Sequence, residues 1–278
     1  MTRSEAVSSL GAYDTRLDPE IRAFIARTNT WYPPESLNLP IAQQREIYNG
    51  MCQAFHCGTP PGVGSVDGTI MLKGRALRVR RYGLVGREPR ATILYYHGGG
   101  FVLGDLDSHD DVCAALCGGT GYEVISVDYR LAPEHRHPAQ FADACALFDW
   151  AARELTRPLL LCGESAGGNL AAAVAHARRG HRRAAFGQVL IYASLSSCNE
   201  GRSYREHAEA PMLAARDLDE YRRYRLIGER ALQQLPDPAL NHVSAPDGNS
   251  AAMIVRHLRT RMRGARWLPK LPSSALPP

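Results

Sequence analysis

The stretch Gly163-Glu164-Ser165-Ala166-Gly167 joins an apolar run, residues 159–162, to an alanine-rich run, residues 166–179. The apolar run is typical of a buried strand and the alanine-rich run of a helix. A G-x-S-x-G pentapeptide at such a junction makes a sharp turn, for which the two glycines leave room because they have no Cβ. The pattern predicts that Ser165 exposes its hydroxyl at the N-terminus of the following helix, which favours negative charge there. Ser165 is therefore a candidate nucleophile.

A glycine-rich loop lies upstream, where His97-Gly98-Gly99-Gly100 follows the apolar run 91–96. The oxyanion that forms when a serine attacks an ester needs backbone N–H donors close by, and glycine lets a loop approach a substrate closely. Gly98, Gly99 and Gly100 meet that need, and the N–H of Ala166 supplies a further donor. A lone G-x-S-x-G sequence is as often an ordinary tight turn, but the two motifs together predict a nucleophile beside an oxyanion hole.

Strand-like and helix-like segments alternate through the middle of the chain. Buried strands are expected at 91–96, 123–127, 159–162 and 189–192, and a half-buried strand near a sheet edge at 76–82. Helices are expected at 108–118 with Ser108 as N-cap, at 141–154 and at 166–179. Continuous apolar strands separated by helices predict an α/β fold with a mostly parallel sheet and helices on both faces.

The segments on either side of this alternation have different patterns. Asp18-Pro19 marks a helix start with Asp18 as N-cap, a second helix is expected at 41–56, and the Gly- and Pro-rich segment 58–68 is expected to be a linker. Residues 200–235 are charged and helical in pattern, which predicts an insertion on the sheet. We expect N-terminal helices at 1–60, a core at 61–241 that carries the insertion, and an atypical basic tail at 242–278.

Composition limits the classes of function. The net charge is +5, and residues 242–278 contain six Lys or Arg against one Asp, so the preceding part is formally neutral. This favours a basic tail over a nucleic-acid-binding face. No apolar leader and no run near the roughly 20 residues that span a bilayer are present. The odd number of cysteines, 7, favours reduced thiols. We expect a cytoplasmic protein with no membrane span and no nucleic-acid partner.

One helical face raises the question of a metal. His109, Cys113 and Cys117 are spaced to share a face, and they are metal-ligating residue types. No fourth ligand lies nearby in the sequence, so the pattern favours buried thiols on a core helix and predicts no metal site.

Three motifs in order carry a resemblance to a known family. They are His97-Gly98-Gly99-Gly100-Phe101, Asp128-Tyr129-Arg130-Leu131-Ala132-Pro133-Glu134 and Gly163-Glu164-Ser165-Ala166-Gly167-Gly168-Asn169. They resemble the hormone-sensitive-lipase-like carboxylesterases of the α/β-hydrolases, over about residues 15–241. The resemblance implies that Gly99, Gly100 and Ala166 form the oxyanion hole with Gly98 adjacent, that His97 organises the loop, and that the N-terminal helices and residues 200–235 form a cap. It also implies hydrolysis of short acyl esters through an acyl-serine, without a metal or cofactor.

The acid and the histidine of a catalytic triad are not identified. The family places them after the nucleophile in D-P-L-type and H-G-F-type turns, and neither motif is found here. His176 is expected to point away from Ser165. The residues to test first, if a triad is completed, are Asp237, Asp247, His242 and His257. We expect the last strands to be missing and the tail to replace them, for example through a shifted reading frame, with weak or no turnover.

Two other functions stay open. The first is a catalytically inactive remnant that binds small acyl ligands or a protein partner. The second is a basic nucleic-acid-binding protein, which rests on the tail alone. The sequence does not determine the oligomeric state, the acyl chain length or the physiological ester.

Overall fold

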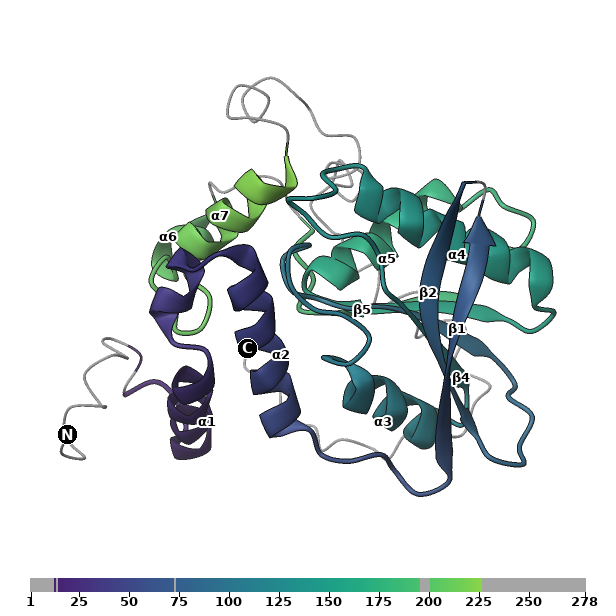
Figure 1. Ribbon diagram of the computed structural model, residues 1–278, viewed down its shortest axis with the longest axis horizontal. Coiled ribbons are helices and arrows are strands. Elements are labelled where there is room, and N and C mark those ends of the chain that lie inside the picture. Colours follow the sequence, from purple (N-terminus) through teal and green to yellow (C-terminus); the bar gives the residue numbers. More distant parts are fainter. Residues whose placement is uncertain (1–12, 14, 73, 196–200, 227–278) are drawn as a thin grey trace. The chain divides into compact units, whose positions relative to one another are not determined.

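A computed structural model of the chain describes residues 13, 15–72, 74–195 and 201–226, which lie in one compact unit. In these residues a six-stranded sheet has the order β1-β2-β4-β3-β5-β6 (Figure 1). Its strands are β1 (Val63–Leu72), β2 (Arg75–Leu84), β3 (Thr92–Tyr96), β4 (Glu123–Val127), β5 (Leu159–Glu164) and β6 (Gly187–Ile191). The strands β3 to β6 run parallel, whereas β1 and β2 form a hairpin that pairs antiparallel with β4.

Helices cover both faces of the parallel strands, as the sequence predicts. They are α3 (Asp110–Thr120), α4 (Ala139–Glu154) and α5 (Ala166–Ala177). Successive side chains of a strand point to opposite faces. Leu94 and Tyr96 of β3 accordingly belong to the core cluster that α4 and α5 complete, and Ile93 and Tyr95 belong to the cluster that includes Cys113 of α3. Every residue of β3 and β4 is therefore buried.

A group of helices lies beside this core on the left of Figure 1. It comprises α1 (Pro19–Trp31), the 3₁₀ helix η3 (Pro34–Asn38), α2 (Ile41–Phe55), α6 (Arg202–Glu206) and α7 (Ala215–Arg225). Tyr48 of α2 and Tyr221 of α7 pack against a small buried cluster that contains Val102 and Leu103. The N-terminal helices and part of the 200–235 segment thus meet on the loop that follows β3.

Two local expectations are wrong. The segment 58–68 is not a simple linker, because β1 begins at Val63 and pairs with β2 residue for residue. It escapes a sequence pattern because β1 is an edge strand with most of its side chains exposed, so glycines occur where apolar residues would reveal it. β2 is the second strand of the sheet, so it lies near the edge as its alternating pattern predicts.

The start of α3 is the other difference. The helix begins at Asp110 with His109 in the N-cap position, so Ser108 is not the N-cap. The hydroxyl of Ser108 is used one turn earlier, where it accepts a hydrogen bond from the Asp105 N–H at 2.8 Å. Asp18 does occupy the N-cap position of α1, although its side chain makes no capping hydrogen bond.

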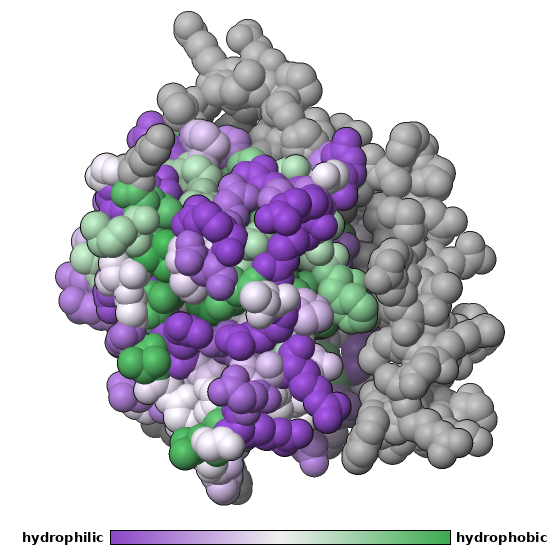
Figure 2. Space-filling view, turned by 90° about the vertical axis from the view of Figure 1, so that its right-hand side faces the viewer, coloured by the Kyte–Doolittle hydropathy of each residue, from purple (hydrophilic) through white to green (hydrophobic). Residues whose placement is uncertain are grey.

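The remaining observations concern the surface and the described limits. Hydrophilic residues cover much of the face turned to the viewer in Figure 2, with hydrophobic residues in smaller groups between them. Among the described helices none has both the length and the apolar character to cross a bilayer. The six described cysteines are free thiols. The expectation that the last strands are missing falls on residues 227–278, which lie outside the described part.

Candidate active site

The turn between β5 and α5 holds Ser165 in a backbone conformation that few non-glycine residues adopt. Its φ is 51° and its ψ is −119°, and its N–H donates to the Ile191 carbonyl at 2.9 Å. A Cβ on Gly163 would lie 2.4 Å from the backbone of Gly167, and one on Gly167 would lie 1.9 Å from the Tyr96 carbonyl oxygen. Both glycines are therefore required, and Ser165 remains partly exposed at the start of α5.

The loop after β3 turns back on itself through three residues of positive φ, which are Gly99 at 99°, Gly100 at 62° and Phe101 at 66°. The Gly99 carbonyl accepts hydrogen bonds from the N–H groups of Val102 and Leu103. A Cβ on Gly99 would lie 2.3 Å from the Leu103 carbonyl oxygen, so only glycine fits there. We call residues 97–101 the oxyanion loop.

His97 is fully buried and is held by its surroundings. Its Nδ1 donates to the Gly98 carbonyl at 2.8 Å, and its ring stacks on Tyr129 with 4.2 Å between centroids. The Tyr129 hydroxyl donates to the His97 carbonyl at 2.7 Å. Burial, with a further contribution from His109, lowers the pKa of His97 to about 4, so the ring is neutral near pH 7. These contacts suit the loop-organising role expected for His97.

Glu164 contacts the same loop from the other side. This carboxylate is 7% exposed and accepts hydrogen bonds from the Tyr95 hydroxyl at 2.5 Å, from His109 Nε2 at 2.9 Å and from the Gly98 N–H. Burial alone would raise the pKa of Glu164, but the hydrogen bond and charge of His109, with the Tyr95 bond, hold it below the usual value. Because the Gly98 N–H is directed at Glu164, Gly98 supports the expected oxyanion hole instead of belonging to it.

Both ring nitrogens of His109 are engaged. Nε2 contacts Glu164 and Nδ1 lies 2.8 Å from the Ser108 hydroxyl. Neither nitrogen therefore faces Cys113 or Cys117, which are buried in the core beneath α3. In the described part of the chain, no group of three or more metal-ligating side chains is arranged to hold a metal ion.

Helix α2 clamps the segment that follows the oxyanion loop. Arg45 donates to the carbonyls of Val102 and Ala132, each at 2.9 Å, and its guanidinium makes two bonds to Glu134. Asn49 donates to Asp105 at 2.5 Å. Through Arg45, Glu134 is thus joined to α2 and to the carbonyls of Val102 and Ala132.

Tyr48 of α2 and Tyr221 of α7 pack against the residues that follow the oxyanion loop. Burial raises the pKa of Tyr48 well above its usual value, and neighbouring Glu164, Tyr192 and Tyr221 add to the shift. A Cβ on Gly100 would lie 2.5 Å from the ring of Tyr221, so α7 packs directly on the oxyanion loop. No spacing in the sequence predicts that these residues interact, because Tyr48 and Tyr221 belong to α2 and α7 and Tyr192 follows β6.

Arg225 of α7 also packs on the oxyanion loop. Its guanidinium lies 3.8 Å from the centroid of the Phe101 ring, a distance typical of a cation–π contact. Its carbonyl accepts a hydrogen bond from the His137 N–H at 2.9 Å.

The partners that would activate Ser165 are not found in the described residues. Within residues 13–226, as far as they are described, no side chain hydrogen-bonds to Ser165 Oγ. His176 lies near the far end of α5, eleven residues along the helix and thus about 16 Å from the turn. The other candidates, Asp237, Asp247, His242 and His257, lie outside the described residues.

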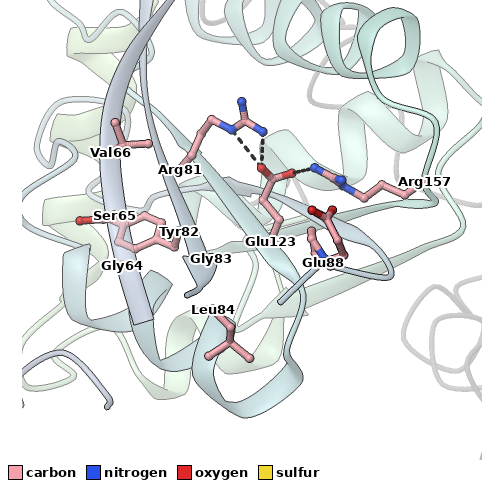
Figure 3. Close-up of a pocket in the computed structure, with 11 residues that line it drawn as sticks. Gly64, Ser65, Val66, Arg81, Tyr82, Gly83, Leu84, Glu88, Glu123 and Arg157 are labelled. Atoms are coloured by element: carbon pink, nitrogen blue, oxygen red, sulfur yellow. Dashed lines mark hydrogen bonds and ion pairs between the residues drawn. The ribbon is translucent and has the colours of Figure 1, made fainter. Parts of the chain in front are cut away.

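A cavity of about 430 Å³ lies at the opposite end of the sheet. Figure 3 shows Arg81 and Arg157 directed at Glu123, which is the first residue of β4. Arg81 Nε donates to Glu123 at 2.9 Å, and Arg157 donates at 2.7 Å. β4 and β5 run in the same direction on either side of β3, and Ser165 follows the last residue of β5. The cavity at the start of β4 is therefore not part of the candidate active site.

Comparison with known proteins gives a consistent result. A family model described as alpha/beta hydrolase fold matches residues 93–258. Esterase LipI of Mycobacterium tuberculosis is 41% identical over 156 residues, 53% of this chain and 48% of LipI. Carboxylic ester hydrolase LipN of that organism is 32% identical over 217 residues, 73% of this chain and 57% of LipN.

Solved structures give the same picture. Ester-hydrolase EH1AB1 from the metagenome of Lake Arreo, in complex with a derivative of bipyridine phosphonate, has a TM-score of 0.74 and 30% identity. The match covers 83% of this chain and 76% of that one. By contrast, the chain spans about half the length of the curated relatives it matches first.

Proposed function

The chain belongs to the α/β-hydrolase fold family, and on this premise we propose that it is a carboxylic ester hydrolase that attacks short acyl esters with Ser165. The observation that carries the proposal is the conformation of Ser165, which a required glycine on either side holds at φ 51° at the N-terminus of α5. Such strain is kept where it exposes a reactive oxygen. The esterase relatives support the same class of reaction.

The reaction would proceed in two steps. Ser165 Oγ bonds to the ester carbonyl carbon, and the carbonyl oxygen becomes an oxyanion that accepts from the N–H groups of Gly99, Gly100 and Ala166. The bond to the alcohol then breaks, and the alcohol leaves with the serine proton. Water attacks the acyl-serine in the same way, releasing the carboxylic acid and returning a proton to Ser165.

The proton transfers need a base and an acid that orients it. We assign neither, and Asp237, Asp247, His242 and His257 are the first residues to replace if turnover is found. His97 is not the base in this scheme, because burial lowers its pKa to about 4 and its Nδ1 is bonded to Gly98.

The tyrosines support the assignment to short acyl groups. Tyr48 and Tyr221 pack against the cluster of Val102 and Leu103, the residues that follow the oxyanion loop. Tyr221 contacts Gly100 directly. A bulky ring against Gly100, one of the proposed oxyanion donors, favours short acyl groups over long ones.

A second candidate is a binding protein that keeps the pocket without turnover. It is favoured by one observation, the lack of a side-chain partner for Ser165 Oγ in the described residues. Such a protein would bind small acyl ligands or a protein partner through the same pocket.

Two measurements on the purified full chain separate these functions. The first is initial-rate hydrolysis of p-nitrophenyl butyrate, beside Ser165→Ala. The second is covalent labelling of Ser165 by p-nitrophenyl butylphosphonate, followed by intact mass, which needs attack but no second step. Turnover that disappears in Ser165→Ala supports the esterase. Labelling without turnover places the defect in deacylation. If the wild-type protein shows no labelling and no turnover, the esterase proposal is refuted in favour of the binding protein.

A further inference from the structure

Glu164 connects the two halves of the proposed site. It precedes Ser165 in the turn, and it is one of the few carboxylates that the fold buries, at 7% exposure. Its Oε1 accepts from the Gly98 N–H and from His109 Nε2, and its Oε2 accepts from the Tyr95 hydroxyl. A buried carboxylate is costly unless it is fully hydrogen-bonded, and this one has three donors.

The contact with the oxyanion loop is close enough to dictate a residue type. A Cβ on Gly98 would lie 2.5 Å from Glu164 Oε1 and 3.2 Å from the Glu164 carbonyl oxygen. The φ of Gly98 is not in the positive region that favours glycine. A side chain at position 98 would therefore displace the Glu164 carboxylate, although the backbone conformation of Gly98 does not by itself require glycine.

Two successive peptide groups of the loop are fixed by these contacts. In the first, the Gly98 N–H donates to Glu164, and the His97 carbonyl accepts from the Tyr129 hydroxyl. In the second, the Gly98 carbonyl accepts from His97 Nδ1. A trans peptide is planar, with its N–H opposite its carbonyl, so holding the Gly98 carbonyl fixes the direction of the Gly99 N–H.

His109 completes the arrangement from α3. Its ring lies 5.3 Å from that of His97 and 6.4 Å from those of Tyr95 and Tyr48. Ser108, bonded to His109 Nδ1, is itself bonded to the backbone of Asp105. His109 is thus held in one orientation and presents Nε2 to Glu164.

We propose that Glu164 and His109 are positioning residues of the oxyanion loop, which aim the Gly99 N–H at the oxyanion through the fixed peptide of Gly98. The inference rests on the proposed function, because it concerns the same site. Neither residue touches the substrate in this scheme. Their effect is on the rate of attack, through the geometry of the donors, rather than on the binding of the acyl group.

The test uses the rate of phosphonate labelling, which separates binding of the reagent from attack by Ser165. Glu164→Leu keeps a similar volume and removes every acceptor. Glu164→Gln keeps an acceptor for Gly98. We expect Leu to lower the maximal labelling rate by about 10²-fold, the usual effect of losing one oxyanion donor. We expect Glu164→Gln to label about tenfold faster than Glu164→Leu, and His109→Gln to label about tenfold more slowly than wild type. The affinity for the reagent should change less than threefold in all three variants.

Glu123→Gln is the matched control. Glu123 is also buried in the sheet, at 6% exposure, and also accepts hydrogen bonds from three residues, but it lies at the other end of the parallel strands. Its replacement should leave the labelling rate within twofold. The inference is overturned if folded Glu164→Leu labels at the wild-type rate, if Gln is no better than Leu, or if Glu123→Gln loses as much.

A second measurement keeps the two proposals distinguishable. Amide hydrogen exchange at Gly98, followed by NMR of the full chain, needs no reaction. We expect slow exchange in the wild type, fast exchange in Glu164→Leu and an intermediate rate in Glu164→Gln. The Gln variant serves as the test if Glu164→Leu does not fold. If the wild-type protein is not labelled, the esterase proposal fails, but amide exchange at Gly98 still tests whether Glu164 and His109 position the loop. If exchange at Gly98 is unchanged in the Glu164 variants, the positioning role is refuted even where labelling succeeds.

Discussion

Two buried glutamates lie at opposite ends of the same parallel strands, and they are held in different ways. Glu123, at the start of β4, is bonded by Arg81, Arg157 and the hydroxyl of Thr92. Glu164, at the end of β5, is bonded by a tyrosine hydroxyl, a histidine and a backbone N–H. In both cases burial opposes ionisation and the partners outweigh it, so both pKa values lie below the usual value.

The difference lies in what each carboxylate holds in place. The partners of Glu123 are side chains from β2, β3 and the segment before β5, so this glutamate fastens strands to one another. Glu164 instead binds the main chain of a loop, at the carboxyl ends of the strands, where open α/β sheets place their ligands. Loss of the first should be felt as stability and loss of the second as reactivity.

The largest expected effect comes from a substitution that displaces the backbone in the turn between β5 and α5, next to Glu164. In Gly167→Ala the new Cβ would lie 1.9 Å from the Tyr96 carbonyl oxygen, so backbone must move, and we expect a loss on the order of 4 kcal/mol of unfolding free energy. Gly187→Ala, at the start of β6, meets nothing within 4 Å and should change stability by less than about 0.5 kcal/mol. Urea denaturation of both variants checks this, and equal losses would contradict a turn more tightly specified than the opposite end.

A pH effect should follow from His97. Its pKa is about 4 in the folded protein and 6.5 ordinarily, so between those values the unfolded chain binds a proton that the folded chain does not. The free energy of unfolding should therefore fall as the pH is lowered from 6.5 to 4, by up to about 3 kcal/mol from this group. The contribution of His97 to stability is fully present above pH 6.5.

The measurement is denaturant unfolding at pH 7, 5.5 and 4, in wild type and His97→Gln. The difference between the two proteins should narrow as the pH falls, since the variant lacks the titrating ring. A difference that stays constant with pH would show that His97 is not buried as a neutral ring.

The Glu123 end should respond to Arg157→Met with a loss of stability alone. Arg157 donates to Glu123 and to Thr92, and its removal leaves Arg81 as the cationic partner of a buried carboxylate. We expect about 2 kcal/mol of destabilisation, below the usual cost of breaking a buried pair because one partner remains. Thermal unfolding checks the loss. A fall in the Ser165 labelling rate without unfolding would mean that the two ends are coupled.

The smallest expected effect comes from Arg45 of α2. Arg45→Met keeps an unbranched side chain but loses the bonds to Val102, Ala132 and Glu134. Because Arg45 and Glu134 are partly exposed, we expect a loss of about 1 kcal/mol or less. Calorimetry of Arg45→Met, Glu134→Gln and the double variant would measure the coupling. Strictly additive losses would show that the Arg45–Glu134 pair contributes no coupling energy, and that Arg45 acts only through its hydrogen bonds to the carbonyls of Val102 and Ala132.

Motifs and periodicity predicted the parts of the fold that depend on local pattern. The buried strands β3, β4 and β5 were located to within two residues, because a strand covered on both faces must be apolar throughout. β1 was missed because an exposed edge strand carries no such demand. The N-cap of α3 was placed one residue early, since Ser108 spends its hydroxyl on the preceding turn.

The site was predicted unevenly for a similar reason. The G-x-S-x-G and H-G-G-G motifs located Ser165 and the oxyanion loop, since each depends on neighbours in the sequence. The contacts of Glu164 were not predicted, because its partners Tyr95, Gly98 and His109 belong to other elements and no spacing in the sequence brings them together. The triad acid and base remain unassigned.

The position of Tyr221 against Gly100 has a consequence for how this protein could change over evolutionary time. The ring of Tyr221 packs on Gly100 of the loop for which we propose the oxyanion-stabilising role. Substitutions that make room for bulkier esters at this position would therefore loosen Gly100, and selectivity and rate would be exchanged against each other. A lineage that comes to accept a wider range of esters is expected to change first at Tyr192. This side chain is 76% exposed and, among the described residues, is not seen to support the oxyanion loop.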